Sequence, residues 1–176
     1  RLLCTGRAER EKGFHLAIKA VSRINEIDLH LDIVGTGAHI GELRRLVGDL
    51  GLSDRVSIHG RVDDEELSRL YSSADAYLLP TIRYEGLPLA LLEAMAHGLP
   101  TVASRIGGNR DVITHEHDGL FISPGNLDEL TSAIRRLGTD PEFRSSLSEA
   151  ARETTERRFD KKRMVIETVE VLSSIS

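Results

Sequence analysis

Two glutamates, Glu85 and Glu93, stand with seven residues between them. Glu85 follows a short apolar run, Ala76–Leu79, that predicts a buried strand, and Glu93 lies inside a predicted helix over Leu87–His97. It is the only charged residue in the first ten positions of that helix. Glu93 therefore lies about 9 Å along the axis of a helix that starts at Leu87. Two carboxylates arranged in this way suit two parts of one elongated ligand better than a single metal ion.

Two cations are expected near the same place. Arg7 follows the predicted strand Leu2–Thr5, and Lys12 stands next to Gly13, just before a predicted helix. Together with the free amide groups of helix N-termini, these cations favour a site for a polyanion such as a phosphate. The alternative interpretation is a pair of solvated surface charges.

The elements that must position these groups alternate between short apolar runs and helical patterns. Strand–helix alternation of this kind predicts an α/β fold, with a doubly wound parallel sheet that is covered by helices on both sides. The expected strands are Leu2–Thr5, Leu31–Val34, Val56–His59, Ala76–Leu79, Thr101–Ala103 and Leu120–Ile122. The expected helices are Phe14–Ile24, Ile40–Leu50, Asp64–Ser73, Leu87–His97, Leu127–Leu137, Pro141–Glu156 and Lys161–Leu172.

Most of these strands end at a loop that contains glycine, including Gly6, Gly35 and Gly37, Gly60, and Gly107 and Gly108. In an open parallel sheet the carboxyl ends of the strands lie on one edge, where ligands bind. Glycine lets backbone amides approach a ligand closely. For any single loop the simpler interpretation is that glycine ends a strand or caps a helix, but several such loops at one edge favour a ligand crevice.

The bulk properties indicate one soluble globular domain. The chain has 176 residues, 40% of them hydrophobic and 29% charged, with a net charge of −5 that argues against nucleic acid as the main partner. A single cysteine, Cys4, is expected to pack inside a strand and excludes an intramolecular disulfide. No apolar run has transmembrane length and no signal peptide is visible, so the cytoplasm is the expected location. Because the chain opens directly on a strand without an initiator methionine, we expect it to be part of a longer protein.

A longer pattern of motifs extends over almost the whole chain. Its motifs are Gly6-Arg7, Lys12-Gly13, Val34-Gly35-Thr36-Gly37, Ile58-His59-Gly60-Arg61-Val62, Leu70-Tyr71, Ala74-Asp75-Ala76, Pro80, Glu85-Gly86-Leu87-Pro88, Glu93-Ala94-Met95-Ala96, Gly98-Leu99-Pro100, Val102-Ala103-Ser104, Gly107-Gly108, Asp118-Gly119 and Pro124-Gly125. This pattern resembles the C-terminal half of the retaining GT-B glycosyltransferases of the glycosyl transferase group 1 family (family 4), and the Glu-x7-Glu element is highly specific within it.

The resemblance implies a Rossmann-like domain over 1–176 that binds a nucleotide-diphosphate sugar. In it, Arg7 and Lys12 would hold the donor diphosphate, Glu93 would accept hydrogen bonds from the ribose hydroxyls, and Glu85 would contact the donor sugar. These roles agree with elementary chemistry, because a carboxylate only accepts hydrogen bonds and so suits a vicinal diol. The residues that the resemblance assigns to catalysis are Arg7, Lys12 and Glu85, and those that it assigns to donor binding are Gly6, Gly35, Gly37, Arg61, Val62, Gly86, Leu87, Glu93, Gly107 and Gly108.

The resemblance also implies transfer of the sugar to an acceptor hydroxyl with retention at the anomeric carbon. No cofactor is implied, and no Asp-x-Asp motif calls for a divalent metal, because protein cations can replace it in this family. The acceptor, a glycan or a lipid-linked glycan, would be bound by an N-terminal domain that this chain lacks, toward which the helix over 161–176 is expected to pack. After Gly108 the sequence departs from the family pattern at Asn109-Arg110-Asp111, and Thr81 replaces the usual serine, which leaves the sugar preference open.

Three other classes of function stay open from the residues alone. A nucleotide-sugar epimerase of similar fold would bind the same donor, although the motifs fit it less well. A dinucleotide-dependent dehydrogenase is argued against by Ile40, which stands where the fingerprint begun by Gly35 needs its third glycine. A non-catalytic nucleotide-binding or interaction module is the third class.

Two further features receive the simpler interpretation. His115 and His117 resemble a pair of metal ligands, but they lie in a polar loop without an evident third ligand. The basic cluster Arg157-Arg158-Phe159-Asp160-Lys161-Lys162-Arg163 is expected to be a solvated linker, with peripheral contact to an anionic membrane face as the alternative.

Overall fold

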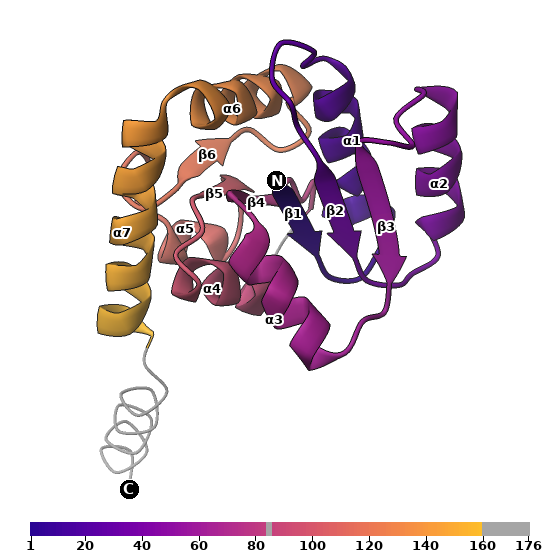
Figure 1. Cartoon of the computed structure of the whole chain (residues 1–176). Helices are drawn as coiled ribbons and strands as arrows, with labels where there is room; N and C mark the ends of the chain where they lie inside the picture. Colours follow the sequence, from indigo (N-terminus) through magenta and orange to yellow (C-terminus); the bar gives the residue numbers. More distant parts are fainter. Residues whose placement is uncertain (84–85, 160–176) are drawn as a thin grey trace, which may run out of the picture.

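The computed structural model describes residues 1–83 and 86–159, and shows a single parallel sheet between two layers of helices (Figure 1). In chain order its elements are β1 (Leu2–Thr5), the short 3-10 helix η1 (Arg10–Lys12), α1 (Phe14–Ser22), β2 (Leu31–Val34), α2 (Ile40–Asp49), β3 (Val56–Gly60), α3 (Asp64–Ser73), β4 (Ala76–Leu79), α4 (Leu89–Ala96), β5 (Thr101–Ser104), α5 (Asn109–Val112), β6 (Leu120–Ile122), α6 (Leu127–Thr139) and α7 (Pro141–Arg158).

The six strands are arranged in the order β3-β2-β1-β4-β5-β6, and every neighbouring pair is parallel. β1 lies inside the sheet, where Leu2 is paired with Leu31 of β2 on one side and with Ala76 of β4 on the other. The chain therefore builds outward from β1 to β3, returns to the other side of β1, and builds outward again to β6. This is the doubly wound arrangement that the alternation of strands and helices predicts, and it confirms the expected fold class.

The predicted elements are confirmed, with small changes at their ends. Four strands have the expected bounds, β3 extends to Gly60, and β5 extends to Ser104. The helix that carries Glu93 begins at Leu89 rather than Leu87, because Pro88 is its N-cap and has a non-helical backbone (φ −84°, ψ 79°). The short helices η1 and α5 were not predicted, since single turns leave too few residues for a periodic pattern. The expected helix Lys161–Leu172 lies outside the described residues.

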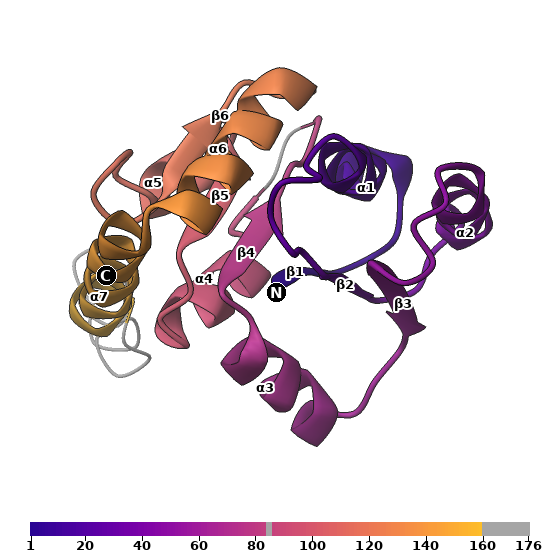
Figure 2. The ribbon, with the colours of Figure 1, turned by 45° about the horizontal axis from the view of Figure 1, so that its top comes forward.

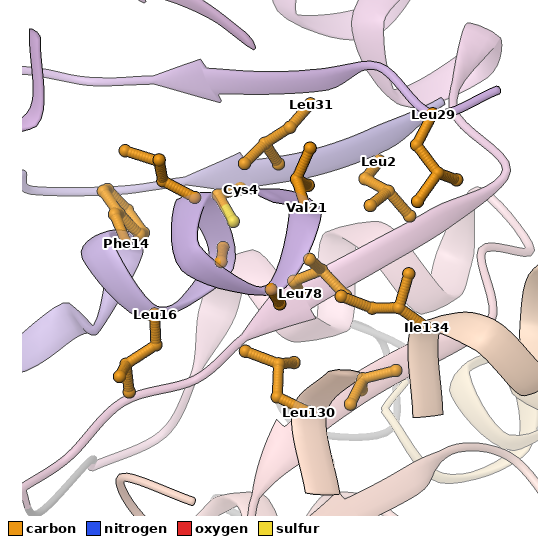
Figure 3. Close-up of a cluster of buried hydrophobic side chains, with 14 of the residues drawn as sticks. Leu2, Cys4, Phe14, Leu16, Val21, Leu29, Leu31, Leu78, Leu130 and Ile134 are labelled. Carbon is orange, nitrogen blue, oxygen red and sulfur yellow. The ribbon is translucent and has the colours of Figure 1, made fainter. Parts of the chain in front are cut away.

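Two apolar clusters fill the space on the two faces of the sheet. Figure 2 shows α1, α2 and α6 on one side of the sheet and α3 and α4 on the other. The first cluster contains side chains of α1, α2, α6 and α7, and the second contains side chains of α3, α4, α5 and α7. β1 supplies alternate side chains to the two clusters, with Leu2 and Cys4 in the first and Leu3 in the second. Figure 3 shows the first cluster, in which Cys4 lies beside α1. Each fully buried aliphatic side chain of this kind stabilises the fold by about 1.5–3 kcal/mol.

The expected role of Cys4 is confirmed, because its side chain is completely buried in the first cluster. Burial raises the pKa of the Cys4 thiol well above its ordinary value, so the side chain remains a neutral, apolar packing group. Among the described helices, none is both long and apolar enough to cross a membrane.

A buried carboxylate, Asp32, lies on β2 and is held by three polar side chains. Its oxygens accept hydrogen bonds from Arg1 at 2.8 Å and from His59 at 2.7 Å, and His30 lies 3.6 Å away. Burial alone raises the pKa of Asp32, but the hydrogen bonds from His59 and Arg1 outweigh this effect, so the pKa lies below its ordinary value. The ionised form of Asp32 therefore stabilises the folded state.

We expect Asp32→Asn to lower the free energy of unfolding at pH 7 by about 1–3 kcal/mol, because it removes charge-assisted hydrogen bonds. Since the pKa of Asp32 is lower in the folded than in the unfolded chain, the stabilisation is present above the unfolded pKa. It begins to fall near the unfolded pKa of about 4 and is lost as the pH falls through the lower folded pKa, below which the two proteins should have the same stability. Urea titrations from neutral to acidic pH measure this difference.

Glu153→Gln is the matched control, because Glu153 is paired with Arg157 at the surface, where 62% of its side chain is exposed. Such exposed pairs contribute about 0–1 kcal/mol. If the free energies of unfolding of Asp32→Asn and the unmodified chain differed by the same amount down to acidic pH, Asp32 would not stabilise the fold through its ionised form.

Candidate functional site

All six carboxyl strand ends lie at one edge of the sheet, which we call the rim. It is formed by the loops that follow β1, β2, β3, β4 and β5. The order of the strands reverses between β1 and β4, and at such a switch point the loops of neighbouring strands lead to opposite faces of the sheet and leave a crevice between them. The loop after β1 carries Arg7 and Lys12, and the loop after β4 leads to Gly86.

Backbone hydrogen bonds join the loops of the first half of the rim. The amide of Gly6 donates to the carbonyl of Val34 at 3.0 Å, and the amide of Ala8 donates to that of Thr36 at 2.9 Å. The amide of Gly35 donates to the carbonyl of Gly60 at 2.7 Å. The amides of Gly6 and Gly35 are thus used inside the fold, so any contribution of these two glycines to ligand binding comes through the shape of the loops.

Two of the predicted glycines are required by the closeness of this packing. A Cβ atom at Gly35 would lie 1.8 Å from the carbonyl oxygen of Gly6, and one at Gly37 would lie 2.5 Å from that of Ala8. Gly35 also has a φ of 139°, which other residues rarely adopt. A structural role in the loops is therefore enough to explain why these positions are glycine. Their small size also lets the loops after β1 and β2 touch directly.

The loop that carries both predicted cations is fastened to the loop after β4. Lys12 lies in η1, and a Cβ atom at the following residue, Gly13, would lie 1.9 Å from the carbonyl oxygen of Pro80. The amide of Ile82 donates to the carbonyl of Glu11 at 2.8 Å. Lys12 is half-buried, whereas Arg7 is exposed. The structure thus places both cations at the rim, on the loop that borders the switch point.

The loops after β4 and β5 also touch. A Cβ atom at Gly108 would lie 2.1 Å from the carbonyl oxygen of Gly86, so only glycine fits there. Gly107 has a φ of 46° and lies in the same turn. Leu87 is 53% exposed beside Gly86. Gly86 therefore meets Gly107 and Gly108 at the rim, as their positions after β4 and β5 predict, while Glu85 lies outside the described residues.

Glu93 projects from an exposed position on α4, and a hydrogen bond links it to the buried interior. The hydroxyl of Tyr71 on α3 donates to Oε2 of Glu93 at 3.2 Å. The same hydroxyl lies 3.0 Å from Oγ1 of Thr5, the last residue of β1. Glu93 is therefore two hydrogen bonds away from the residue that precedes Gly6 and Arg7. This chain of contacts links Glu93 to the end of the strand from which the loop with the cations starts.

The positions of α3 and α4, which allow Tyr71 to reach Glu93, are set by an N-cap and by apolar packing. α3 begins at an N-cap, Asp63, whose carboxylate accepts a hydrogen bond from the amide of Glu66 at 2.8 Å. Both helices bury their apolar faces in the second cluster, and Leu91 and Met95 of α4 are completely buried there. Glu93 lies between these two positions in sequence, which turns it away from the core and toward the surface beside α3.

The segment after β3 lies farther along the rim. Arg61 is exposed, and Val62 is half-buried and packs against the second cluster. Gly60, with a φ of 75°, makes the turn that precedes them. The structure thus brings Arg61 and Val62 to the same edge of the sheet as the cations.

Several side chains of this region make contacts that the sequence did not reveal. The motif Leu70-Tyr71 was noticed without a role for Tyr71, and Thr5 was interpreted only as the end of a strand. Asn109, part of the departure from the family pattern, is completely buried and donates from Nδ2 to the carbonyl of Ser104 at 2.9 Å. It stabilises the turn after β5, whereas the neighbouring Arg110 is exposed.

His115 has a structural role in its loop, because its Nδ1 accepts a hydrogen bond from the amide of Phe121 at 2.9 Å and its ring stacks on that side chain. Over residues 1–83 and 86–159, no group of three or more His, Cys, Asp or Glu side chains could hold a metal ion. His97 is the C-cap of α4, as its position at the end of the predicted helix indicated, and its ring stacks on Tyr71.

The basic cluster is described only as far as Phe159. Within that part, Arg158 donates to the carbonyl of Asp111 at 2.6 Å, and Arg157 pairs with Glu153 at 2.9 Å. These two arginines are exposed, as expected, but they lie at the end of α7 and not in a linker.

Comparisons with known proteins agree on one family. The sequence pattern of the family described as "Glycosyl transferases group 1" matches residues 1–154. "Uncharacterized glycosyltransferase MJ1607" from Methanocaldococcus jannaschii is 33% identical over 171 residues, which cover 97% of this chain and 44% of that protein. "GDP-mannose-dependent alpha-(1-6)-phosphatidylinositol monomannoside mannosyltransferase" from Mycobacterium tuberculosis is 30% identical over 169 residues, which cover 90% of this chain and 44% of that protein.

A solved structure shows the same fold. The crystal structure of Anabaena HepE in complex with UDP superimposes with a TM-score of 0.92 and 25% sequence identity, covering 98% of this chain and 48% of that one. The chain thus spans about half the length of the proteins that it matches.

We expect Gly35→Ala to lower the free energy of unfolding by about 2–4 kcal/mol, because the new Cβ atom would overlap a backbone carbonyl at a strained φ. Gly48→Ala is the matched control, since Gly48 lies in α2 with open space around it. That change should raise the free energy of unfolding by about 0.5–1 kcal/mol, the ordinary gain from replacing a helical glycine. Chemical denaturation measures both values, and equal effects of the two changes would contradict the loop contact.

Proposed function

The chain belongs to the group 1 glycosyl transferases, and we propose that it forms the part of such an enzyme that binds a nucleotide-diphosphate sugar. The observation that supports this proposal is the link from Glu93 through Tyr71 to Thr5 at the end of β1, because it joins the carboxylate to the loop of Arg7 and Lys12. A ligand with a diol at one end and a diphosphate in the middle fits such an arrangement.

The cations Arg7 and Lys12 would hold the diphosphate. Both lie on the loop after β1, and a guanidinium and an ammonium are the side chains best suited to phosphate oxygens. As the bond to the sugar breaks, negative charge grows on the leaving diphosphate. Fixed positive charges at that point stabilise the transition state more than the ground state.

Glu93 would accept hydrogen bonds from the two ribose hydroxyls of the nucleotide. Its carboxylate has two oxygens with about four acceptor positions in all, and Tyr71 uses one of them. The remaining positions suit a vicinal diol. Each charge-assisted hydrogen bond of this kind contributes roughly 1.5–3 kcal/mol.

The opposite end of the ligand, the sugar, would lie near the loops after β4 and β5. Gly86 and Gly108 bring these loops together, and the amides of Gly86 and Leu87 would serve the sugar and phosphate. Glu85, the predicted partner of the sugar hydroxyls, belongs to the same motif. The nucleobase would lie beside Arg61 and Val62 at the other end of the rim.

The proposed reaction transfers the sugar to an acceptor hydroxyl with retention of configuration. The bond between the anomeric carbon and the diphosphate oxygen breaks, and a bond to the acceptor oxygen forms on the same face. The proton of the acceptor hydroxyl passes to the leaving diphosphate. In this proposal the protein cations balance the charge of the leaving group, so the reaction uses no metal ion and no cofactor.

The acceptor, a glycan or a lipid-linked glycan, would be bound by a part of the protein that these 176 residues do not contain. We therefore expect the chain alone to bind nucleotide and to transfer little or no sugar. We place the reaction in the cytoplasm, with the cytoplasmic face of a membrane as the site where a lipid-linked acceptor would be met.

The base of the donor differs among similar proteins. HepE binds UDP, and the mycobacterial relative is named for GDP-mannose. The base preference of this chain is therefore to be measured with uridine, guanosine and adenosine diphosphates together.

We expect one of UDP, GDP and ADP to bind best in isothermal titration calorimetry, and Glu93→Ala to weaken its binding by about tenfold or more, because hydrogen bonds to a charged group are lost. Glu149→Ala, at an exposed glutamate on α7, is the matched control. Unchanged affinity in Glu93→Ala would remove Glu93 from the site, and failure of all three nucleotides to bind would refute the proposed function.

Arg7→Gln separates diphosphate binding from nucleoside binding. We expect it to weaken binding of the preferred nucleoside diphosphate by about tenfold at low salt, since a charge-assisted contact is lost, and to leave binding of the matching nucleoside unchanged. The loss should shrink as salt is added, because the screening length falls from about 10 Å near 0.1 M to about 3 Å near 1 M. Arg69→Gln on α3 controls for the change in net charge. An equal loss for nucleoside and diphosphate would contradict the role of Arg7.

A further inference from the structure

The hydroxyl of Tyr71 joins three elements that are far apart in the sequence. It is a buried group on α3, and it contacts Glu93 on α4 and Thr5 on β1. A second tyrosine, Tyr77 on β4, lies with its hydroxyl 3.1 Å from Oγ1 of Thr5 and 3.3 Å from the carbonyl oxygen of Thr5. These side chains form a continuous row of hydroxyl groups that starts in the core and ends at the exposed carboxylate of Glu93.

The direction of the hydrogen bonds along this row is determined by its last member. An ionised carboxylate only accepts, so Tyr71 is the donor to Glu93 at 3.2 Å, and the carbonyl of Ala90 is a more distant acceptor of the same hydroxyl at 3.5 Å. The hydroxyl of Thr5 must then donate to Tyr71, and Tyr77 must donate to an oxygen of Thr5. Each donor strengthens the next, because a hydroxyl that accepts a hydrogen bond is a better donor.

The ring of Tyr71 is buried and packs against two other rings, which leaves its hydroxyl little freedom. The imidazole of His97 stacks on it with ring centroids 5.1 Å apart and planes 11° apart. The ring of Tyr77 lies 6.1 Å away on an inclined plane. Burial, together with the neighbouring charge of Glu93, raises the pKa of Tyr71 well above its ordinary value. Tyr71 is therefore a protonated and fixed donor at neutral pH.

We propose that Tyr71 is a positioning residue for donor binding, which holds one oxygen of Glu93 so that its other acceptor positions face the ribose diol. An exposed glutamate on a helix samples several rotamers, and a ligand that needs one of them has to order the side chain. The hydrogen bond from Tyr71 orders it before the ligand arrives, which lowers the entropic cost of binding. This inference rests on the proposed function, because it takes Glu93 as the ribose-binding group.

The competing interpretation is that the hydroxyl of Tyr71 only satisfies buried polar groups and supports the fold. The two interpretations differ in how nucleotide binding responds to its removal. A structural role affects all ligands of the domain alike, whereas a positioning role affects only the part of the binding energy that comes from the ribose hydroxyls.

The test uses Tyr71→Phe, which retains the ring and its contact with His97 and removes the hydroxyl. Calorimetry compares whichever of UDP, GDP and ADP binds best with the 2′,3′-dideoxy form of the same nucleotide. We expect Tyr71→Phe to weaken binding of the ribonucleotide about fivefold, which corresponds to about 1 kcal/mol and is typical of one lost hydrogen bond. Binding of the dideoxy form should change by less than about twofold, since it lacks the hydroxyls that Glu93 accepts from.

Two further variants separate positioning from stability. Thr131→Val removes a buried hydroxyl on α6, on the opposite face of the sheet, where it donates to the carbonyl of Leu127 at 2.7 Å. We expect this control to lower the melting temperature without changing the affinity for either nucleotide. In a Glu93→Ala background, Tyr71→Phe should have no further effect on the ribonucleotide, because the group through which it acts is absent.

The outcomes distinguish this inference from the proposed function. A strong effect of Glu93→Ala without an effect of Tyr71→Phe would overturn the positioning role alone. So would an equal loss for the ribonucleotide and the dideoxy form, or simple additivity with Glu93→Ala. Absence of binding by every ribonucleotide would overturn the proposed function together with the inference.

Discussion

Six strands pair in parallel with β1 inside the sheet, and this pattern decides where each loop with a functional residue lies. Parallel pairing sends every carboxyl end to one edge, so residues that are far apart in the chain, such as Arg7 and Gly108, meet at the same rim. The reversal of strand order between β1 and β4 places the cationic loop next to the loop that leads to the Glu-x7-Glu motif. Strand order therefore decides which loops are neighbours in the candidate site, and the side chains of those loops then determine its chemistry.

At this edge, the loops of neighbouring strands touch directly through their backbones, and these contacts fix the shape of the rim. Gly35 fits against the carbonyl of Gly6, Gly13 against that of Pro80, and Gly108 against that of Gly86. These contacts occur between loops of neighbouring strands and exclude a Cβ atom, so the loops support one another without side chains between them. A rim built in this way presents charged groups such as Arg7 from a fixed backbone, which favours binding because little ordering is left to the ligand.

The candidate site contains an exposed carboxylate that is hydrogen-bonded by a buried tyrosine. Glu93 is accessible to a ligand, but Tyr71, which holds it, is almost completely buried and belongs to a row of hydroxyls that reaches Tyr77. Buried hydroxyl groups need partners, and here the row supplies one to each member and ends at a charge. The polar groups of the second apolar cluster thus serve the fold and orient the carboxylate of Glu93.

Much of this protein could be predicted from the residues alone. The alternation of apolar runs and helical patterns identified every strand and every helix of more than four residues within residues 1–83 and 86–159, because strands and longer helices repeat with periods that depend only on local geometry. The motif residues Arg7, Lys12 and Glu93 were recognised by type and spacing. Their presence at one edge followed from the general rule that parallel strands end together.

Contacts between elements could not be predicted in the same way. That Tyr71 on α3 reaches Glu93 on α4 depends on how two helices pack against one sheet, and no spacing along the chain encodes that distance. The delayed start of α4 at Leu89 depends on the backbone at Pro88. The sequence thus determined which groups are available and which elements carry them. The tertiary structure decided which of them touch, because hydrogen bonds between distant residues form only after the apolar clusters have set the positions of α3 and α4 on the sheet.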